Sequence, residues 1–409
     1  MNTTDATREG SKLTIWLLTF PLFFINFLVF SEHLIVVPLT ASISLATGLA
    51  PEKGGLLVSI YPLAAAFSAL VLGPFSDRLG RKRMLILLCL GFSVSTISFA
   101  TATTVSSALI FRVLSGFFGG PIPANVMAYV GDRFQGNERA KVITMIMLAF
   151  SIASIFAVPL GAWIADMTNW RVPFYTISVT IIICMVLILK MKSVPTGAES
   201  GSILRQYLEF AQLLKLSKVQ KVFTLQFFMI IGLFGFVPNV AVWLSTNYGF
   251  DATQIGLCYM QGGIGGIIGN TASGYFIAKG HKGRLIVIGS MMTCLFLTFS
   301  AQDFLPPYFA GFFFFGLMLG GSFRMPAFQI ILTEIIPTNL RGRMMALSMI
   351  VANVTMGLGG IWSLPFLKLE NGVLTGMKTV TVIGGLSLLV VPFLVRALSR
   401  EMKEAKELY

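Results

Sequence analysis

Charged side chains are scarce in this chain of 409 residues. Asp, Glu, Lys and Arg make up only 11% of it, whereas 55% of its residues are hydrophobic. Soluble domains carry roughly 25% charged residues, so this chain has too few to cover a surface that faces water. The shortage excludes a soluble globular protein and predicts an integral membrane protein.

Histidine and cysteine are also rare, with two and four copies. The four cysteines lie in apolar runs, where they fit small buried side chains, and no CxxC or His/Cys metal spacing occurs. The glycine run at 262–270 lacks the lysine and Ser/Thr of a phosphate-binding loop. A membrane-embedded enzyme needs a nucleophile, an acid–base pair or a metal. We therefore expect neither an enzyme nor an ATP-driven pump, and no metal or cofactor.

Long apolar runs, by contrast, fill most of the sequence. A helix needs about 20 apolar residues to cross the hydrocarbon core of a bilayer, and about a dozen runs approach that length. Together they predict an all-α integral membrane protein with 12 transmembrane helices. The expected spans lie near residues 14–38, 54–76, 84–103, 106–130, 142–164, 173–191, 219–244, 253–278, 285–302, 306–332, 344–366 and 376–396.

The basic residues fall mostly on one side of this topology. An even number of spans puts both termini on one side, and the loops and tails of that side hold 24 of the 30 Lys and Arg residues. Because Lys and Arg accumulate in cytoplasmic loops, we expect a multi-pass protein of the cell (inner) membrane with both termini in the cytoplasm. The net charge of +13 is then a topology signal with some attraction to the lipid bilayer, and it does not predict a nucleic-acid partner.

The second half of the chain echoes the first. A glycine, an acid and an arginine that close the fourth span and its loop recur in the tenth span at one constant offset. The alternative is that any two apolar segments look alike. The matched residues are Gly119, Asp132 and Arg139 in the first half, and Gly321, Glu334 and Arg341 in the second.

Parallel halves of six spans are a transporter plan in which the binding site lies near the midplane between them. We expect a six-helix bundle over residues 1–191 and another over 219–409. The polar connection 192–218 begins as a Gly/Ser/Pro linker and continues as an amphipathic stretch, which predicts a cytoplasmic surface helix.

The stretch "GPFSDRLGRKR" (73–83) places an acid and several bases between two apolar spans and recurs weakly at 274–284. Gly73 permits close backbone approach, and Asp77 can bind a helix N-terminus or an arginine. Such a contact can form in one conformation and break in another. We expect a conformational latch here, the alternative being a simple basic turn. Its members are Gly73, Asp77, Arg78, Gly80, Arg81, Asp132, Arg139, Glu334 and Arg341.

Three motifs resemble the major facilitator superfamily, in its sugar-efflux and drug:proton antiporter branch. They are the loop "GPFSDRLGRKR", the fourth-helix "FRVLSGFFGG" with Arg112, and the fifth-helix "AVPLGAWIADMTNWRVPF". Glu32 stands where that branch often has a glutamate. The resemblance implies a transporter of two six-helix halves that works by antiport. One departure is that the fifth-helix motif usually begins with glycines, where this chain has Ser151, Ser154, Ala157 and Val158.

Few charges lie inside the predicted spans. A charge at the bilayer centre costs at least ~2.5–3.5 kcal/mol, so each embedded one is a candidate for function. At 1.5 Å per residue, Glu32 in the first span and Arg112 in the fourth both lie ~9 Å to the outer side of the midplane. We expect them to meet, with Glu32 carrying a proton and His33 next to it titrating or binding substrate. The alternatives are a structural ion pair and a histidine at the outer rim.

Arg324, the second embedded base, is expected to face a water-filled cavity on a helix broken or bent at "GGSFRMP", where it favours an anionic or hydroxyl-rich substrate. The alternative is an arginine that packs helices together. Other polar residues of the spans are equally consistent with substrate binding and with helix–helix hydrogen bonds. These candidates are Asn26, Gln226, Asn239, Gln261, Gln329 and Asn353.

The leading interpretation is a monomeric secondary active transporter that exports small organic solutes, such as drugs or sugars, in exchange for protons by alternating access. The alternative is a proton-coupled uptake symporter of a small, possibly anionic, solute.

Overall fold

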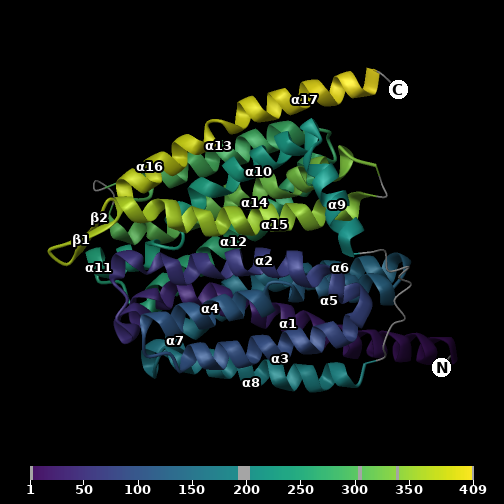
Figure 1. Cartoon of the computed structure of the whole chain (residues 1–409), viewed down its shortest axis with the longest axis horizontal. Helices are drawn as coiled ribbons and strands as arrows, with labels where there is room; N and C mark the ends of the chain where they lie inside the picture. The colour runs from purple at the N-terminus through teal and green to yellow at the C-terminus, as the bar shows by residue number, and fades with distance from the viewer. Residues whose placement is uncertain (1–2, 192–202, 303–305, 338–339, 408–409) are drawn as a thin grey trace.

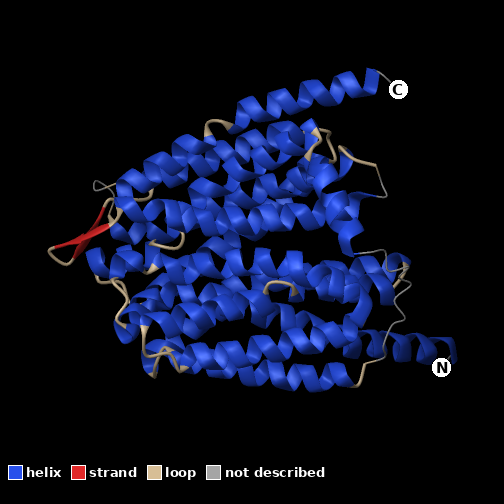
Figure 2. Ribbon diagram, in the orientation of Figure 1, coloured by secondary structure: helices blue, strands red, loops and turns tan. Residues whose placement is uncertain are grey.

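The computed structural model describes residues 3–191, 203–302, 306–337 and 340–407, which are almost entirely helical (Figure 2). A bilayer core offers no water to backbone N–H and C=O groups, and a helix pairs these groups within itself. The architecture is therefore an all-α membrane fold. In the described residues, strands are confined to one hairpin, β1 (Lys368–Glu370) paired antiparallel with β2 (Val373–Thr375).

The first half of the chain forms eight helices, some of which are consecutive pieces of one span. They are α1 (Thr3–Thr47), α2 (Gly55–Leu79), α3 (Arg81–Ala100), α4 (Val105–Gly119), α5 (Ile122–Arg133), α6 (Gly136–Ile152), α7 (Val158–Met167) and α8 (Arg171–Leu189). The short π-helix η2 (Ala153–Ala157) joins α6 to α7, and the short 3₁₀-helix η1 (Pro51–Lys53) precedes α2.

The second half begins with the connecting helix α9 and continues with eight further helices. They are α9 (Ile203–Leu214), α10 (Ser217–Phe236), α11 (Val240–Tyr248), α12 (Ala252–Ile277), α13 (Lys282–Phe299), α14 (Ala310–Glu334), α15 (Arg341–Ser363), α16 (Met377–Leu388) and α17 (Val391–Glu407). Short 3₁₀-helices precede α14 (η3, Pro307–Phe309) and follow α15 (η5, Leu364–Phe366).

Eleven helical stretches among the described residues are long and apolar enough to cross a membrane. The remaining predicted span, 253–278, corresponds to α12, which is 26 residues long but rich in glycine and polar residues. A Cβ atom on Gly256 would lie 2.9 Å from Cα of Pro159 in α7, and one on Gly269 would overlap the backbone of α14. Glycine is therefore used in α12 for close packing between helices, which lowers its hydropathy.

The structure corrects two sequence expectations about helix limits. The first span was expected to end near residue 38, whereas α1 continues through Pro38 to Thr47. The stretch around Arg324 was expected to be broken or bent, and it is not broken, because α14 is one continuous helix with Pro326 inside it. Proline is tolerated within membrane helices because neighbouring helices satisfy the freed backbone groups.

Figure 1 shows α1 to α8 on one side of the molecule, α10 to α17 on the other, and α9 between them at one end. The two termini lie at that same end, which we name the terminal face. The β1–β2 hairpin and α11 lie at the opposite end, which we name the hairpin face (Figure 1).

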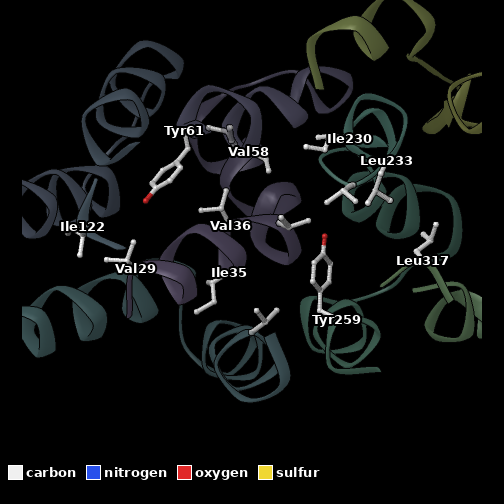
Figure 3. Packing of buried hydrophobic residues seen from close by; sticks show 14 of the residues in the cluster. Val29, Ile35, Val36, Val58, Tyr61, Ile122, Ile230, Leu233, Tyr259 and Leu317 are labelled. Carbon is white, nitrogen blue, oxygen red and sulfur yellow. The ribbon is translucent and has the colours of Figure 1, made fainter. Parts of the chain in front are cut away.

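The halves meet chiefly where α2 packs on α15 and where α7 packs on α12, with α1 touching α11. Apolar residues fill this contact: Figure 3 shows Val58 on the side of Ile230, with Leu233 next to it, and all three are buried. Close packing of such side chains excludes water. The hydrophobic core therefore runs from one half into the other.

The helix α9 lies against both halves at the terminal face. The Tyr207 hydroxyl donates to the backbone oxygen of Leu70 in α2 at 2.9 Å. Glu209 forms an ion pair with Arg343 in α15 at 2.7 Å. This helix occupies the amphipathic part of the predicted connection, whose first part, 192–202, lies outside the described residues.

Candidate functional site

Glu32 on α1 and Arg112 on α4 form an ion pair inside the first half. The Arg112 Nη1 lies 2.5 Å from Glu32 Oε1, and neither side chain has any exposed surface. The Arg112 Nε also donates to the backbone oxygen of Leu57 in α2 at 3.0 Å. Three helices therefore converge on one buried guanidinium. The sequence placed the two charges at one depth, and the structure brings them into contact.

Aromatic rings surround the pair. The Arg112 guanidinium carbon lies 4.8 Å from the ring centre of Tyr61 and 5.4 Å from that of Phe99. The imidazole of His33 packs on the same Tyr61 ring, with 4.5 Å between the ring centres. His33 thus contacts the ion-pair cluster through Tyr61, and its Nδ1 is buried. The residue as a whole is partly exposed.

The same cluster contains polar atoms without a hydrogen-bond partner among the described residues. They are Oε2 of Glu32, Nη2 of Arg112, Nδ1 of His33 and Oη of Tyr61. Both amide atoms of Asn26, earlier on α1, are buried without a partner as well. Buried polar groups in native proteins are almost always paired, so a gathering of unpaired ones marks a place built for more than packing. Sequence reasoning missed Tyr61, although a tyrosine within the apolar run "SIYPLAAAF" is itself a signal.

Arg324 is buried in the second half and makes different contacts. Its Nη1 donates to Ser290 Oγ on α13 at 3.1 Å, and its Nη2 donates to the backbone oxygen of Met229 on α10 at 2.5 Å. Only 3% of the residue is exposed. The expectation of a cation facing an open cavity is not met in this conformation, because Arg324 joins three helices of one half as a packing residue.

Two of the other polar candidates also bond helices to one another. Gln226 on α10 exchanges hydrogen bonds with Ser348 on α15, and Asn239 donates to Ser363 at 2.9 Å. Gln261 is exposed on α12, where a Cβ on Gly311 would overlap it.

The remaining candidates, Gln329 and Asn353, are half-buried on α14 and α15. The Oε1 of Gln329 is buried without a hydrogen-bond partner among the described residues. Gln329 is therefore the polar candidate of the second half that retains a buried acceptor for a ligand.

At the terminal face each half has an ion pair in a corresponding place. Arg81 at the start of α3 pairs with Asp132 at the end of α5, with 3.3 Å between Nε and Oδ2. Lys282 at the start of α13 pairs with Glu334 at the end of α14. Position 282 is the counterpart of 81 in the repeated stretch, so the echo in the sequence is also an echo in contacts. Each pair joins two helices of the same half, so neither pair connects the two halves.

The first of these pairs belongs to a larger network. Arg81 Nη1 donates to Ser76 Oγ at 2.9 Å, and Ser76 Oγ donates to Asn125 Oδ1 at 2.7 Å. The Asn125 amide donates in turn to the backbone oxygen of Arg81 at 2.9 Å. Sequence reasoning missed Ser76 and Asn125, because neither is charged and their proximity depends on how α2, α3 and α5 pack.

The other expected latch residues differ in their surroundings. Gly80 has a φ of +84°, a conformation that favours glycine, at the turn into α3. A Cβ on Gly73 would meet no atom of the described residues within 4 Å, so among them the close approach expected there is absent in this conformation. Arg78 is exposed, and the side chain of Asp77 lies outside the described part of the structure. Arg341 donates to the backbone oxygen of Thr333 at 3.0 Å, and the Arg139 guanidinium lies beside Gly131.

The hairpin face carries a polar contact between the halves that sequence reasoning also missed. Oδ2 of Asp166, near the end of α7, accepts from the Thr253 backbone N–H at 2.8 Å and from its hydroxyl at 2.6 Å. Thr253 is in the first turn of α12, where N–H groups lack partners within the helix and favour an anion. An acid of one half thus caps a helix of the other.

The departure in the fifth-helix motif has a structural counterpart. Around Ser154 the chain forms the π-helix η2, and the Ser154 hydroxyl donates to the backbone oxygen of Tyr259 in α12 at 3.2 Å. Facing it, a Cβ on Gly263 would lie 2.6 Å from Ile155. The glycines that allow close approach here belong to α12 instead of the fifth span.

Comparison with known proteins decides the family. The family model described as Major Facilitator Superfamily matches residues 20–360. The chain belongs to the Major Facilitator Superfamily. Its members are transporters of small molecules, so this protein is a multi-pass membrane transporter and not an enzyme.

Individual relatives are distant. The uncharacterized MFS-type transporter YceJ of Bacillus subtilis is 25% identical over 343 residues, covering 82% of this chain and 84% of that protein. The bicyclomycin resistance protein homolog of Haemophilus influenzae is 25% identical over 232 residues, covering 56% and 58%. The crystal structure of a D-xylose-proton symporter superposes with a TM-score of 0.74 at 14% identity, covering 92% of this chain and 97% of that one. At that identity the superposition shows the fold alone.

Proposed function

We propose that this superfamily member is a secondary active transporter that exports a small organic solute in exchange for protons. The observation that carries the proposal is the buried pair of Glu32 and Arg112, joined at 2.5 Å with no exposed surface on either side chain. A protein retains such charges against their desolvation cost when they serve function. The name of the bicyclomycin resistance homolog supports export over uptake as the direction.

In this mechanism Glu32 carries the proton. When Glu32 is ionised, Arg112 holds it through the ion pair and the cluster is neutral as a whole. When a proton binds, the pair loses its attraction and Arg112 is left with an excess positive charge. Protonation therefore changes the charge of the cluster by one unit. Substrate and proton then compete, because each favours a different charge state of the Glu32–Arg112 pair.

Alternating access follows from the two halves. We propose that residues 1–191 and 219–409 move as two bundles connected by 192–218, and that the terminal face is cytoplasmic. The contact of Asp166 with Thr253 and the apolar contact around Val58 close the hairpin face in this conformation. The latch at the terminal face, including Arg81 and Asp132, is then in its inward-facing arrangement.

The substrate lies between the bundles in this proposal, with Gln329 and Asn353 as its polar contacts in the second half. The Gln329 Oε1 is buried and available to a donor. Arg324 is left to packing, because its contacts to Ser290 and Met229 occupy two of its three nitrogens. A solute that carries hydroxyl or amide groups and little charge fits this lining.

Transport in reconstituted vesicles tests the function. With radiolabelled bicyclomycin, an uncharged solute with hydroxyl and amide groups, as the probe, we expect accumulation in vesicles whose interior is acidic, because outward proton flow drives antiport. A symporter would accumulate the probe in vesicles with an alkaline interior instead. The variant Glu32→Gln should lower pH-driven accumulation at least tenfold while folding normally. Undiminished coupling in Glu32→Gln would remove Glu32 as the proton carrier.

A further inference from the structure

The unpaired polar atoms beside Glu32 form a series that leads away from it. We propose that the Tyr61 hydroxyl relays protons between Glu32 and the terminal face, where an exporter releases them, and that Asn26 positions the water between Tyr61 and that face. This inference rests on the proposed proton-carrying role of Glu32. Glu32, Tyr61 and Asn26 come from α1 and α2, and each is at least nine-tenths buried.

Helix geometry places Asn26 below the ion pair. Asn26 and His33 are seven residues apart on α1, so they share one face of that helix, about 10 Å apart along its axis. His33 packs on the Tyr61 ring, so this face of α1 is the one that points to Tyr61. Because α1 begins at the terminal face, Asn26 lies nearer to that face than Glu32 does.

The Tyr61 hydroxyl reaches toward the same level. A Cβ on Gly119 would overlap the Tyr61 Oη, and Gly119 follows Arg112 on α4 by seven residues, about 10 Å closer to the terminal face. Figure 3 shows the Tyr61 hydroxyl pointing toward the side of Val29 and Ile122. Val29 lies one turn after Asn26 on α1. The ring of Tyr61 therefore spans from the guanidinium of Arg112 toward the turn that carries Asn26.

The unpaired groups supply what a water-filled path needs. A buried water binds two to four polar partners. Here the partners are Glu32 Oε2, Tyr61 Oη and the two amide atoms of Asn26, none of which has another partner among the described residues. The titratable or charged groups around Glu32 are Arg112 from α4, Tyr61 from α2 and His33 from α1 itself. A hydroxyl can both accept and donate a proton, and Tyr61 connects the carboxyl to the other groups.

The step is balanced in protons. A hydronium ion on the terminal side gives a proton to Tyr61 Oη while the original hydroxyl proton passes through a bound water to Glu32 Oε2. One O–H bond forms on Glu32, one breaks in the hydronium ion, which is left as water, and Tyr61 ends as it began. Release of the proton to the terminal face runs through the same steps in reverse. Asn26 contributes no proton, and its amide fixes the water by donating to it or accepting from it.

A proton jump on the full-length protein in lipid measures this step without any substrate. A photolysed caged acid lowers the pH, and time-resolved infrared spectroscopy follows the C=O band of the protonated carboxyl, assigned to Glu32 by its loss in Glu32→Gln. We expect Tyr61→Phe to slow protonation at least tenfold with an unchanged midpoint pH. We expect Asn26→Leu to slow it at least threefold, which provides a second test if Tyr61→Phe folds poorly.

Tyr259→Phe is the matched control, since its hydroxyl is equally buried and unpaired among the described residues but lies in the second half. It should leave the rate unchanged. Protonation in Tyr61→Phe within twofold of the unsubstituted protein, or a midpoint that moves together with the rate, would overturn the relay. If the infrared spectrum shows no C=O band that is lost in Glu32→Gln, Glu32 is not the proton carrier, and the proposed relay fails with it.

Discussion

The buried ion pair ties stability and function to the same two residues. Removing one partner of a buried pair leaves the other charge uncompensated, which costs far more than removing an exposed pair. Glu32 and Arg112 are fully buried, whereas the side chains of Lys282 and Glu334 are 30% and 39% exposed. The two pairs therefore provide an internal comparison within one molecule.

We predict that Glu32→Ala lowers the free energy of unfolding by about 3–5 kcal/mol, and that Glu334→Ala lowers it by at most about 1 kcal/mol. The double variant Glu32→Leu/Arg112→Met should recover most of the stability while transport stays uncoupled from protons, because apolar side chains replace both charges. Unfolding in detergent micelles measures all three. Equal losses in the two single variants would show that the buried pair is not held by mutual compensation.

At the scale of helices, contacts between halves at the hairpin face hold this conformation. Asp166 of α7 binds Thr253 at the start of α12, whereas Asp251 caps α12 from within its own half by accepting from the N–H of Gln254 at 2.7 Å. Both carboxylates stabilise the same helix end. Of the two, Asp166 also links the halves.

We predict that Asp166→Ala shifts the population toward opening of the hairpin face by about fivefold, since losing such a cap costs ~1 kcal/mol. Distances between spin labels on the hairpin-face ends of α7 and α12 measure the shift. Asp251→Ala is the control and should leave the distances as they are. Identical distances in both variants and the unsubstituted protein would exclude Asp166 as a closing contact.

For the whole molecule, the distribution of basic residues predicts its orientation in the membrane. Lys and Arg gather at the terminal face, at the starts of α3 and α13 and in the tails, while the hairpin face carries few of them. This asymmetry orients a membrane protein during insertion. The proposal that the hairpin face is external therefore follows from charge, independently of the transport mechanism.

We predict that a membrane-impermeant maleimide labels Glu370→Cys, on the β1–β2 hairpin, in intact cells, and labels Glu138→Cys, at the start of α6, only after permeabilisation. Both positions are exposed. The native chain is the background control, because Cys89, Cys184 and Cys258 are buried and Cys294 is half-buried. Labelling of Glu138→Cys in intact cells, with Glu370→Cys labelled only after permeabilisation, would show that the terminal face is external. The proposed direction of proton flow would then be reversed.

The sequence alone determined the membrane class, the approximate number of spans and the two charges that pair. Each of these depends on a property of the local sequence, which is either the length of an apolar run or the free energy of desolvating a single charge. The limits of α1 were less predictable, because Pro38 does not end a helix whose neighbours satisfy its backbone. Glycine-rich α12 likewise has the length of a span without the hydropathy.

The tertiary structure decided which residues surround the pair and how the halves meet. Tyr61, Asp166 and Asn125 gain their partners from helices far away in the sequence, and Arg324 packs within its half where a cavity-facing role was expected. Hydropathy fixes that a helix crosses the membrane, but it leaves the rotation of the helix about its axis nearly free. That rotation, set by close packing against neighbours, determines which polar side chains meet.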